Sequence, residues 1–437
     1  MTAKRIAAHT LGCKVNQYDT EAMLELFQQE GFQIVPLDDP ADVYLINTCT
    51  VTGTGDRKSL QLIRRIRREH PSSFLIVCGC MAQHRGNDLL SLGADLVIGT
   101  QRRNEIIDLF YQVQCTGNPV CAVGPLRTGI PYESLSVSAQ AGHTRAILKI
   151  QEGCSNHCTY CIIPDVRGPV RSRPIDEIRE EVIRLSNAGF REIVLTGIHL
   201  CSYGKDLQPL RSLADVIQVL QDMEGIVRIR LGSLEPTVAT PAFAAMLHHA
   251  DKICPQFHLA LQSGSDSVLA RMKRRYNTAQ YIQGVENLRS EFPHAAFTTD
   301  ILTGFPGETT EEFQDTKKLI EKIGFARIHV FPYSSRPGTP AADYPGQLSA
   351  SVKENRTREL IALGNRIAAD YLRTWEGLES SFLPEEQVNG CWEGYTPEYI
   401  RVRLKQGESC RQGVPLRVRL LDAGSRRMSG EIIKESD

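Results

Sequence analysis

Short apolar runs alternate with amphipathic segments over the first hundred residues. Two segments have helical periodicity: Thr20–Glu30, which ends at a glycine, and Asp56–Glu69, which ends before a proline. The apolar runs that are typical of buried strands are Arg5–Thr10, Val43–Asn47 and Phe74–Val77. This alternation predicts a parallel sheet with crossover helices.

The same alternation resumes at Arg145 with longer units. Helical patterns separate six further apolar runs, so six βα units are predicted, which favours a partial (β/α)6 barrel. The six expected strands are Ala146–Ile150, Glu192–Thr196, Val227–Leu231, Phe257–Leu261, Phe297–Leu302 and Arg327–Phe331.

The character of the chain changes at two places outside these units. Residues 114–143 mix Gly, Pro, Ser and Thr without periodicity, which indicates a linker. After a long helical pattern over Ser351–Tyr371, short strand-like runs predict a small all-β module. The expected organisation is therefore an α/β domain at 1–113, a linker at 114–143, a barrel at 144–373 and a small β barrel at 374–437.

Composition narrows the class of protein. The chain of 437 residues is 41% hydrophobic and 23% charged with a net charge of −1, as in globular proteins. No apolar run approaches the roughly 20 residues needed to span a bilayer, and the N-terminus has no signal-peptide pattern, so we expect no membrane contact and a cytoplasmic protein. In that reducing compartment the 13 cysteines are expected to include metal ligands or catalytic thiols.

Three cysteines share one loop after a predicted strand. Cys154, Cys158 and Cys161 have the spacing C-x3-C-x2-C. A loop of this size can hold three corners of a cubane iron–sulfur cluster and leave the fourth iron without a protein ligand. An open iron can bind the amino and carboxylate groups of S-adenosylmethionine (SAM) and pass an electron to its sulfonium, which releases a 5′-deoxyadenosyl radical. The alternative is a zinc site completed by His157.

Three more cysteines follow three predicted strands. Cys13, Cys49 and Cys80 come after the runs that begin at Arg5, Val43 and Phe74. The carboxyl ends of parallel strands meet at one edge of a sheet, so these thiols are expected to converge on a second metal centre. The alternative for any one of them is a buried, inert thiol, which is how we interpret the other cysteines, Cys78 included.

The predicted barrel strands run into Gly, Pro or polar residues at their carboxyl ends, the face that carries the chemistry of barrel enzymes. His199 lies there too, although a single histidine is more often structural. The residues expected to bind SAM are Gly197, Glu235, Gln262, Asp300, Gly304 and Phe331. They are chosen from their positions and from the family resemblance that is described below.

Basic residues gather in two places. On Asp56–Glu69 they surround an apolar stripe, and a solvated helix face and a nucleic-acid contact are both open interpretations. In the β module, a period of two predicts shared strand faces that suit phosphate contact and base stacking. The residues expected to bind RNA there are Tyr399, Arg401, Arg403, Arg417 and Arg419.

Along nearly its whole length the sequence resembles the methylthiotransferase family of radical-SAM enzymes. The motifs that carry the resemblance are Leu11-Gly12-Cys13-Lys14-Val15-Asn16-Gln17, Asn47-Thr48-Cys49-Thr50-Val51, Gly79-Cys80-Met81-Ala82-Gln83, Gln151-Glu152-Gly153-Cys154 through Pro164, Arg167-Gly168 to Arg173, Leu261 to Ser265, and Gly304 to Thr309. The tail, with Gly394-Tyr395-Thr396 and Tyr399 to Val402, is similar to the TRAM module, a small β-barrel associated with RNA.

The resemblance implies two [4Fe–4S] clusters. Cys154, Cys158 and Cys161 would hold the one that cleaves SAM, and Cys13, Cys49 and Cys80 would hold an auxiliary cluster for the sulfur that is methylated by a first SAM. Lys14 to Asp19 most resemble the branch that converts N6-threonylcarbamoyladenosine beside the tRNA anticodon to its 2-methylthio derivative. The implied partners are tRNA through its anticodon arm and a reducing electron donor such as a flavodoxin or ferredoxin.

Three alternatives stay open at this point. Sister branches of the family act on isopentenyladenosine in tRNA or on an aspartate of a ribosomal protein. From another class, a non-catalytic RNA-binding protein could use zinc for structure alone.

Overall fold

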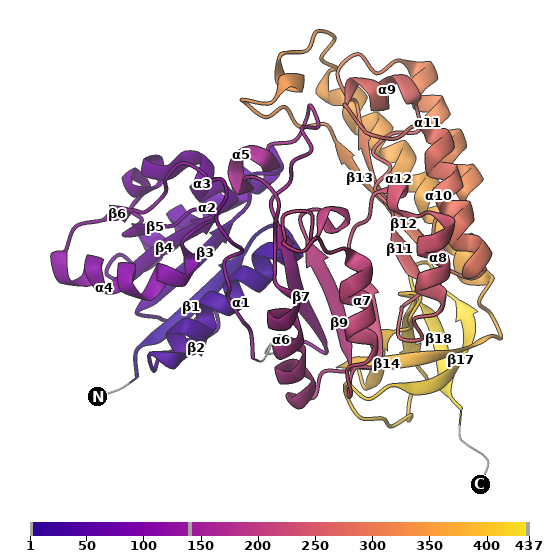
Figure 1. Cartoon of the computed structure of the whole chain (residues 1–437), viewed down its shortest axis with the longest axis horizontal. Coiled ribbons are helices and arrows are strands. Elements are labelled where there is room, and N and C mark those ends of the chain that lie inside the picture. The colour runs from indigo at the N-terminus through magenta and orange to yellow at the C-terminus, as the bar shows by residue number, and fades with distance from the viewer. Residues whose placement is uncertain (1–2, 139–141, 434–437) are drawn as a thin grey trace.

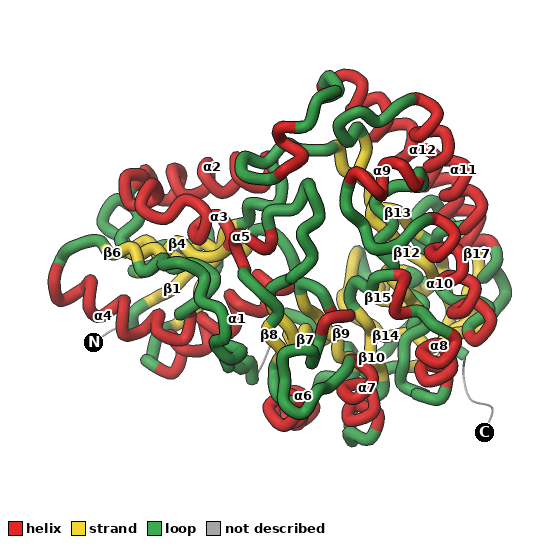
Figure 2. Tube along the Cα trace, turned by 45° about the horizontal axis from the view of Figure 1, so that its top comes forward, coloured by secondary structure: helices red, strands yellow, loops and turns green. Residues whose placement is uncertain are grey.

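A computed structural model of the protein describes residues 3–138 and 142–433. The chain forms an N-terminal α/β domain, a central partial barrel and a small β barrel at its C-terminal end (Figure 1). Figure 2 separates the helices from the strands and shows helices on both sides of the N-terminal sheet and on the outer side of the central strands.

The N-terminal domain is built on a parallel sheet of six strands. Their order is β2-β1-β3-β4-β5-β6, and every neighbouring pair is parallel. Helices α1 and α4 pack on one face of the sheet, while α2 and α3 pack on the other. The bounds are β1 Arg5–Thr10, α1 Lys14–Gln29, β2 Gln33–Val35, β3 Val43–Thr48, α2 Gly53–Glu69, β4 Phe74–Gly79, α3 Cys80–Arg85, β5 Leu96–Val97, α4 Ile106–Thr116 and β6 Val120–Cys121.

Two predicted boundaries in this part are wrong. Helix α1 begins at Lys14, six residues before the predicted start at Thr20, because its first turns are stabilised by tertiary contacts of buried polar side chains such as Asn16 and Asp19 rather than by an apolar stripe. The segment predicted as a linker from residue 114 still contains the end of α4, and β6 adds to the sheet. Residues 139–141 of that segment lie outside the described residues.

The central unit confirms the predicted six βα strands. Together with the short additional strand β8, they form two groups, β8-β7-β9-β10 and β11-β12-β13. Isolated bridges from Ile229 to Ile253 and from Leu234 to Leu259 connect the two groups. The strand bounds are β7 Arg145–Glu152, β8 Arg171–Ser172, β9 Glu192–Gly197, β10 Arg228–Leu231, β11 Gln256–His258, β12 Ala296–Thr303 and β13 Arg327–Pro332. The helix bounds are α5 Ile163–Arg167, α6 Ile175–Asn187, α7 Leu213–Gln221, α8 Pro241–His248, α9 Asp266–Arg271, α10 Thr278–Glu291, α11 Thr310–Ile323 and α12 Ala350–Arg373.

The N-terminal domain covers part of the inner face of the partial barrel. Along β7, Ala146 and Leu148 belong to the core between the strands and the outer helices. Ile147 points to the opposite face, as the strand period of two requires, and there it packs with Tyr18 and Ala22 of α1. The polar residues of α1 are therefore brought against the inner surface of the barrel.

The C-terminal unit is a closed barrel in the order β14-β15-β16-β18-β17. Its bounds are β14 Glu379–Val388, β15 Cys391–Tyr395, β16 Arg401–Leu404, β17 Leu416–Ala423 and β18 Met428–Ile432. The last three strands correspond to the strand-like runs of the sequence, Tyr399–Leu404, Pro415–Leu421 and Met428–Ile433. The first two lack a clear alternating pattern, because β14 contains Pro384 beside a register shift and β15 contains Gly394, where a Cβ would lie 1.9 Å from the Leu383 carbonyl oxygen.

This small barrel packs against the amino ends of the central strands. Arg230 of β10 donates hydrogen bonds to the carbonyl oxygens of Pro397 and Thr396 at 2.7 and 3.2 Å. Arg145, the first residue of β7, pairs with Glu385 at 2.6 Å. In the described residues, no helix is long and apolar enough to cross a membrane.

Candidate functional site

Cys13, Cys49 and Cys80 lie at the carboxyl edge of the N-terminal sheet. The strand register pairs Thr10 with Asn47 and Thr48 with Gly79, so strands β1, β3 and β4 end side by side. Cys13 caps the start of α1, Cys49 follows β3 directly, and Cys80 begins α3. The three thiols interact electrostatically with one another, as the parallel topology predicts.

Two glycines permit this close approach. Gly12 has φ +111°, and a Cβ there would lie 3.1 Å from the Sγ of Cys49. Gly79 has φ +93°, and a Cβ there would lie 2.2 Å from the Oδ1 of Asn47. Only glycine fits such a backbone conformation without strain.

The surroundings of these thiols disfavour an uncompensated negative charge on sulfur. Burial, together with the neighbouring Cys80 and Cys13 thiols, raises the pKa of Cys49 to about 12. Burial raises the pKa of Cys80 as well. Thiolate is the form that binds metal, and a metal centre supplies the positive charge that stabilises it. Three soft donors gathered in this way fit an iron–sulfur cluster.

Cys154, Cys158 and Cys161 lie on the loop between β7 and α5. The amide of Asn156 donates to the Sγ of Cys154 at 3.4 Å, and the amide of Cys154 donates to the carbonyl oxygen of Gly168 at 3.0 Å. Burial raises the pKa of Cys154, and it raises that of Cys161 to about 12. The loop therefore presents a second set of three thiols that fits a cluster in the same way.

A hydrogen-bonded chain of polar residues lies beside this loop. Arg274 donates to the Sγ of Cys158 at 3.2 Å and to Glu235 at 3.0 Å. Glu235 also lies 3.2 Å from the Nε2 of His199 and accepts from Asn156 at 3.2 Å. Although burial acts to raise the pKa of Glu235, the hydrogen bond from His199 and the nearby arginines lower it, so this carboxyl is held ionised.

Among the described residues, no group of three or more His, Cys, Asp or Glu side chains is arranged to hold a single metal ion. A tetrahedral zinc site would need Zn–S bonds of about 2.3 Å to every thiolate, which draws the sulfurs close together. A cubane spreads its thiolates over different irons. The two kinds of centre therefore make different demands on the spacing of the same thiols.

A buried ionic cluster connects the two sets of cysteines. Asp19 of α1 and Glu152 of β7 are each shared by three cations that are almost completely buried, namely Arg103, Lys149 and Arg167. Arg167 ends α5, the helix that follows the loop of Cys161, and its Nε donates to the Sγ of Cys80 at 3.3 Å. It also donates to Asn16. One side chain of the barrel unit therefore reaches the cysteines of the N-terminal domain.

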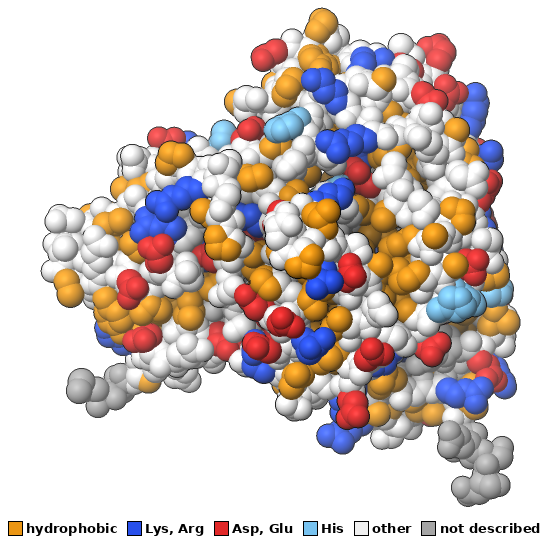
Figure 3. Space-filling view, in the orientation of Figure 1, with side chains coloured by type: hydrophobic (Ala, Val, Ile, Leu, Met, Phe, Trp, Pro, Cys, Tyr) orange, Lys and Arg blue, Asp and Glu red, His pale blue; other side chains and the backbone are white. Residues whose placement is uncertain are grey.

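The residues predicted to bind SAM lie at or near the carboxyl ends of the barrel strands. Asp300 pairs with His258 at 3.4 Å, and Gln262, with φ +66°, bridges to β12. Gly197 ends β9, and the amide of Gly304 donates to Glu308 at 2.8 Å. Figure 3 shows that the molecular surface is hollowed near its centre, between the strand groups of the barrel.

Phe331 and Glu235 complete the predicted SAM set. The Phe331 side chain is 44% exposed although it lies on a barrel strand, so an apolar surface is open on the inner side. Sequence reasoning did not find three polar contacts of the cysteines: Asn156, Arg167 and Arg274. Single polar residues have no periodic signal. Asn156 and Arg167 lie within motifs that carry the family resemblance, whereas Arg274 lies in none of them.

The predicted strand face that would join Tyr399 to the arginines of the β barrel is wrong. Strand β16 begins at Arg401, and Tyr399 precedes it with φ +65°. Its ring stacks on Tyr395 with centroids 4.6 Å apart and packs against the guanidinium groups of Arg145 and Arg230. The ring therefore packs against side chains of the central unit and lies off the strand face on which it was predicted.

The four predicted arginines do face outward from the barrel, but each has a carboxylate partner. Arg401 pairs with Glu393 at 2.6 Å, and Arg403 lies 3.9 Å from the same carboxylate. The partner of the other two, Arg417 and Arg419, is Glu379, at 2.5 and 3.2 Å.

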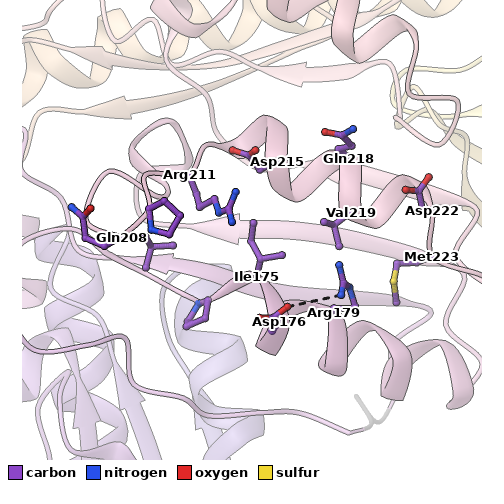
Figure 4. A pocket seen from close by; sticks show the side chains of 13 residues that line it. Ile175, Asp176, Arg179, Gln208, Arg211, Asp215, Gln218, Val219, Asp222 and Met223 are labelled. Carbon is purple, nitrogen blue, oxygen red and sulfur yellow. Dashed lines mark ion pairs between the residues drawn. The ribbon is translucent and has the colours of Figure 1, made fainter.

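A separate pocket of about 860 Å³ opens between α6 and α7 (Figure 4). Its lining includes the apolar side chains of Ile175, Val219 and Met223 and an ion pair between Arg179 and Asp176 at 3.9 Å. None of the described residues that line it is a cysteine or a predicted site residue, so it is not part of the candidate site.

Comparisons with known proteins match the N-terminal domain and the central unit to two different families. Residues 5–99 match the uncharacterized protein family UPF0004, and residues 148–320 match the radical SAM superfamily. The chain is 40% identical to the threonylcarbamoyladenosine tRNA methylthiotransferase MtaB of Bacillus subtilis, over 98% of this chain and 96% of the relative. It is 36% identical to the tRNA-2-methylthio-N(6)-dimethylallyladenosine synthase of Pelotomaculum thermopropionicum, over 84% and 83% of the two chains.

A solved structure supports the fold. The radical SAM methyltransferase TsrM of Kitasatospora setae, with cobalamin and a [4Fe–4S] cluster bound, aligns with a TM-score of 0.58 at 13% identity. The alignment covers 78% of this chain and 74% of that one. At this level of identity the similarity concerns the fold alone.

Proposed function

This chain belongs to the radical-SAM methylthiotransferase family, and on that premise we propose that it adds a methylthio group to C2 of N6-threonylcarbamoyladenosine at tRNA position 37, next to the anticodon. The chain is a transferase, and its cofactors are SAM and [4Fe–4S] clusters. The relative that acts on threonylcarbamoyladenosine is matched over almost the full length of both chains, which supports this substrate over the alternatives.

We assign the two sets of cysteines to two clusters. Cys154, Cys158 and Cys161 would hold the cluster that binds SAM, and Cys13, Cys49 and Cys80 would hold the auxiliary cluster. When bound, the clusters and SAM supply the electron, the radical and the sulfur of the reaction.

The residues of the chain bind and orient these groups. Arg274 and Arg167 each donate a charged hydrogen bond to one cysteine sulfur, which favours the thiolate and fixes its direction. Asn156 and Glu235 hold the loop of Cys154 and Cys158 against the barrel. Helix α1 covers the inner face of β7, which limits access of water to reactive intermediates.

The observation that carries the proposal is the contact from Arg167 to Cys80. Helix α5 follows Cys161 after one residue, and its last side chain reaches a cysteine of the other set. A substrate bound at the barrel mouth would therefore meet both sets of thiols. Methylthiolation needs this arrangement, because the carbon that is activated must accept sulfur held at a second centre.

We further propose that tRNA is bound through its anticodon arm and that the target base leaves its stack to reach the barrel mouth. Arg401, Arg403, Arg417 and Arg419 would contact phosphates there. The proposed SAM-binding residues are the six named above. A flavodoxin or ferredoxin in the cytoplasm would supply electrons.

The test is mass analysis of nucleosides from digested tRNA. Cells that lack this protein are compared with cells that carry the chain on a plasmid. We expect 2-methylthio-N6-threonylcarbamoyladenosine only in the complemented cells, with unmethylthiolated N6-threonylcarbamoyladenosine accumulating in the others. The substrate assignment fails if that nucleoside is the same in both while another modification changes.

The similarity to a dimethylallyladenosine-modifying relative makes isopentenyladenosine the second candidate. The same digests contain its methylthio derivative, so one measurement separates the two substrates. A ribosomal-protein substrate would leave both tRNA nucleosides unchanged and add about 46 Da, one methylthio group in place of a hydrogen, to a ribosomal protein.

A further inference from the structure

Helix α2 carries a positively charged surface. Its 17 residues include six Lys or Arg and two Asp or Glu. Ile63 and Ile66 are buried against the sheet, whereas Arg57, Arg64 and Arg68 are exposed on the opposite side. The spacing of seven and four residues puts these three arginines on one stripe of the helix. We call Arg57, Arg64 and Arg68 the α2 stripe.

Most of the positive charge of the α2 stripe and of Lys58 is not paired with a carboxylate of the protein. Arg57 and Arg64, with Lys58 beside them, have no carboxylate partner among the described residues. Arg68 pairs only with the adjacent Glu69, through a side chain that is 74% exposed. The arginines of the C-terminal barrel differ, because each of the four faces a carboxylate. An ordinary solvated helix face mixes both signs of charge, and this one does not.

The position of the helix connects it to the site. Helix α2 begins four residues after Cys49. The amide of Gly53 donates to the Oγ of Ser334 at 3.1 Å, and Arg336 donates to Thr50 at 2.9 Å. Both partners lie on the loop that follows β13, at the carboxyl end of the barrel. The stripe thus starts beside the proposed auxiliary cluster and the barrel mouth.

From there α2 leads outward along the upper side of the N-terminal domain in the view of Figure 2. Arg57 and Arg68 are eleven residues apart, which is about 16 Å along a helix. A surface of this length can contact more than one phosphate of a nucleic-acid strand.

We propose that the α2 stripe, with Lys58, binds the phosphate backbone of the tRNA substrate and directs the anticodon arm to the barrel mouth. This inference rests on the proposed function. Guanidinium groups recognise phosphate by paired hydrogen bonds, and they neutralise the backbone without reading its bases. The stripe therefore positions the tRNA and does not select its sequence.

The test is tRNA binding over a series of salt concentrations. The test variant is Arg57→Gln with Arg64→Gln, since glutamine keeps helix propensity while it removes the charge. The matched control is Lys318→Gln with Lys322→Gln, which removes two exposed charges from α11 on the far side of the molecule (Figure 1). Binding is measured by filter retention with unmethylthiolated tRNA and reconstituted holoenzyme.

We expect the plot of log affinity against log salt concentration to become shallower by about 1.5 for the test variant, because each lost phosphate contact removes about 0.7 to 0.9 from the slope. The control should keep the wild-type slope. Reductive SAM cleavage without tRNA should be the same in all three proteins. A test variant with the wild-type slope overturns the proposal, as does a wild type that does not retain tRNA.

The binding series and the nucleoside digests together separate this inference from the proposed function. If wild-type protein methylthiolates tRNA and the α2 variant keeps its slope, only the binding surface is wrong. If wild-type protein binds tRNA through α2 and the digests show no methylthio product, the reaction is wrong and the surface stands.

Discussion

The Nε of Arg167 lies 3.3 Å from the Sγ of Cys80, although 87 residues separate them in the sequence. The same guanidinium donates to Glu152 and Asn16, so it joins the barrel unit to the N-terminal domain. The side chain is completely buried. A buried charge with so many partners is costly to disturb, because its removal leaves the other charges uncompensated.

Arg167→Gln should therefore lower the free energy of unfolding by about 3 kcal/mol, since it leaves Glu152 with fewer cations. Arg167→Lys keeps the charge and should lose less. Urea denaturation of the reconstituted protein measures both. Arg179→Gln on α6, a side chain that is 51% exposed, serves as the control and should stay within about 0.5 kcal/mol of wild type. If Arg167→Gln were as stable as this control, the ionic cluster would not join the two units.

Gly79→Ala should prevent correct closure of the N-terminal thiol site. The new Cβ would lie 2.2 Å from the Asn47 Oδ1 and 2.5 Å from the Thr48 carbonyl oxygen, in addition to the strain of φ +93°. Gly117→Ala is the matched control, because Gly117 also has a positive φ of +68° but nothing within 4 Å of a Cβ. We expect a loss of about 1 kcal/mol at Gly117 and a clearly larger loss at Gly79, measured by thermal unfolding. Equal losses would contradict the close packing seen at Gly79.

Loss of one cysteine should remove one cluster and leave the other. Cys158→Ala is expected to abolish SAM cleavage and to halve the iron content. Cys49→Ala should also halve the iron, spare SAM cleavage and lose methylthiolation. Cys78→Ala, a buried thiol of the core, should keep all the iron at a cost of about 1 kcal/mol in stability. The two-cluster assignment would not survive a Cys49→Ala protein that still made methylthiolated product.

Glu235→Gln should weaken SAM binding while the iron content stays at the wild-type value. Glu235 accepts hydrogen bonds from Arg274 and Asn156 and faces His199. It lies next to the loop that carries Cys154 and Cys158. SAM carries a positive sulfonium and ammonium group, so a neutral amide there removes a favourable charge. Hydrogen bonds to charged groups contribute about 1.5 to 3 kcal/mol, which corresponds to a rise in Kd of roughly 10- to 100-fold.

Equilibrium dialysis with labelled SAM measures this effect. The control is Glu321→Gln, a carboxylate on the outer helix α11 that is 50% exposed, and its Kd should not change. An unchanged Kd for Glu235→Gln would remove this carboxyl from the SAM site.

Arg401→Ala with Arg403→Ala should weaken tRNA binding and make its salt dependence shallower, with both clusters intact. Because both arginines share Glu393, part of their charge is already neutralised. The change in slope should therefore be smaller than that of the Arg57 and Arg64 double variant. Filter binding in the same salt series compares the two, and an equal or larger change would place the main phosphate contacts on the β barrel.

Some features of this protein could be predicted because they depend on residues that are close together in the sequence. The three thiols between Cys154 and Cys161 fall within eight residues, so any fold of that loop brings them together. The strands of the barrel were predicted from short runs rich in apolar residues, since one face of each strand packs on the outer helices. The convergence of Cys13, Cys49 and Cys80 needed one more premise, a parallel sheet in which strand ends align.

Other features had no signal along the chain. Strand β14 contains Pro384 and a bulge, and β6 has two residues, so neither has a recognisable period. Arg167 and Arg274 are single polar residues whose partners are distant in sequence. Tyr399 was expected on a strand face with Arg401, but a left-handed backbone turns it toward the central barrel.

The amino-acid sequence alone was enough to nominate cysteines as cluster ligands and to predict the strands that precede them, because ligand spacing and apolar runs are properties of neighbouring residues. It took the folded structure to place Arg167 against Cys80 and Tyr399 against Arg145 and Arg230. The fold also leaves Arg57 and Arg64 of α2 without a carboxylate partner among the described residues, whereas each of the four arginines of the β barrel has one. These outcomes depend on which distant side chains share a buried space, and the pattern along a chain does not encode that pairing.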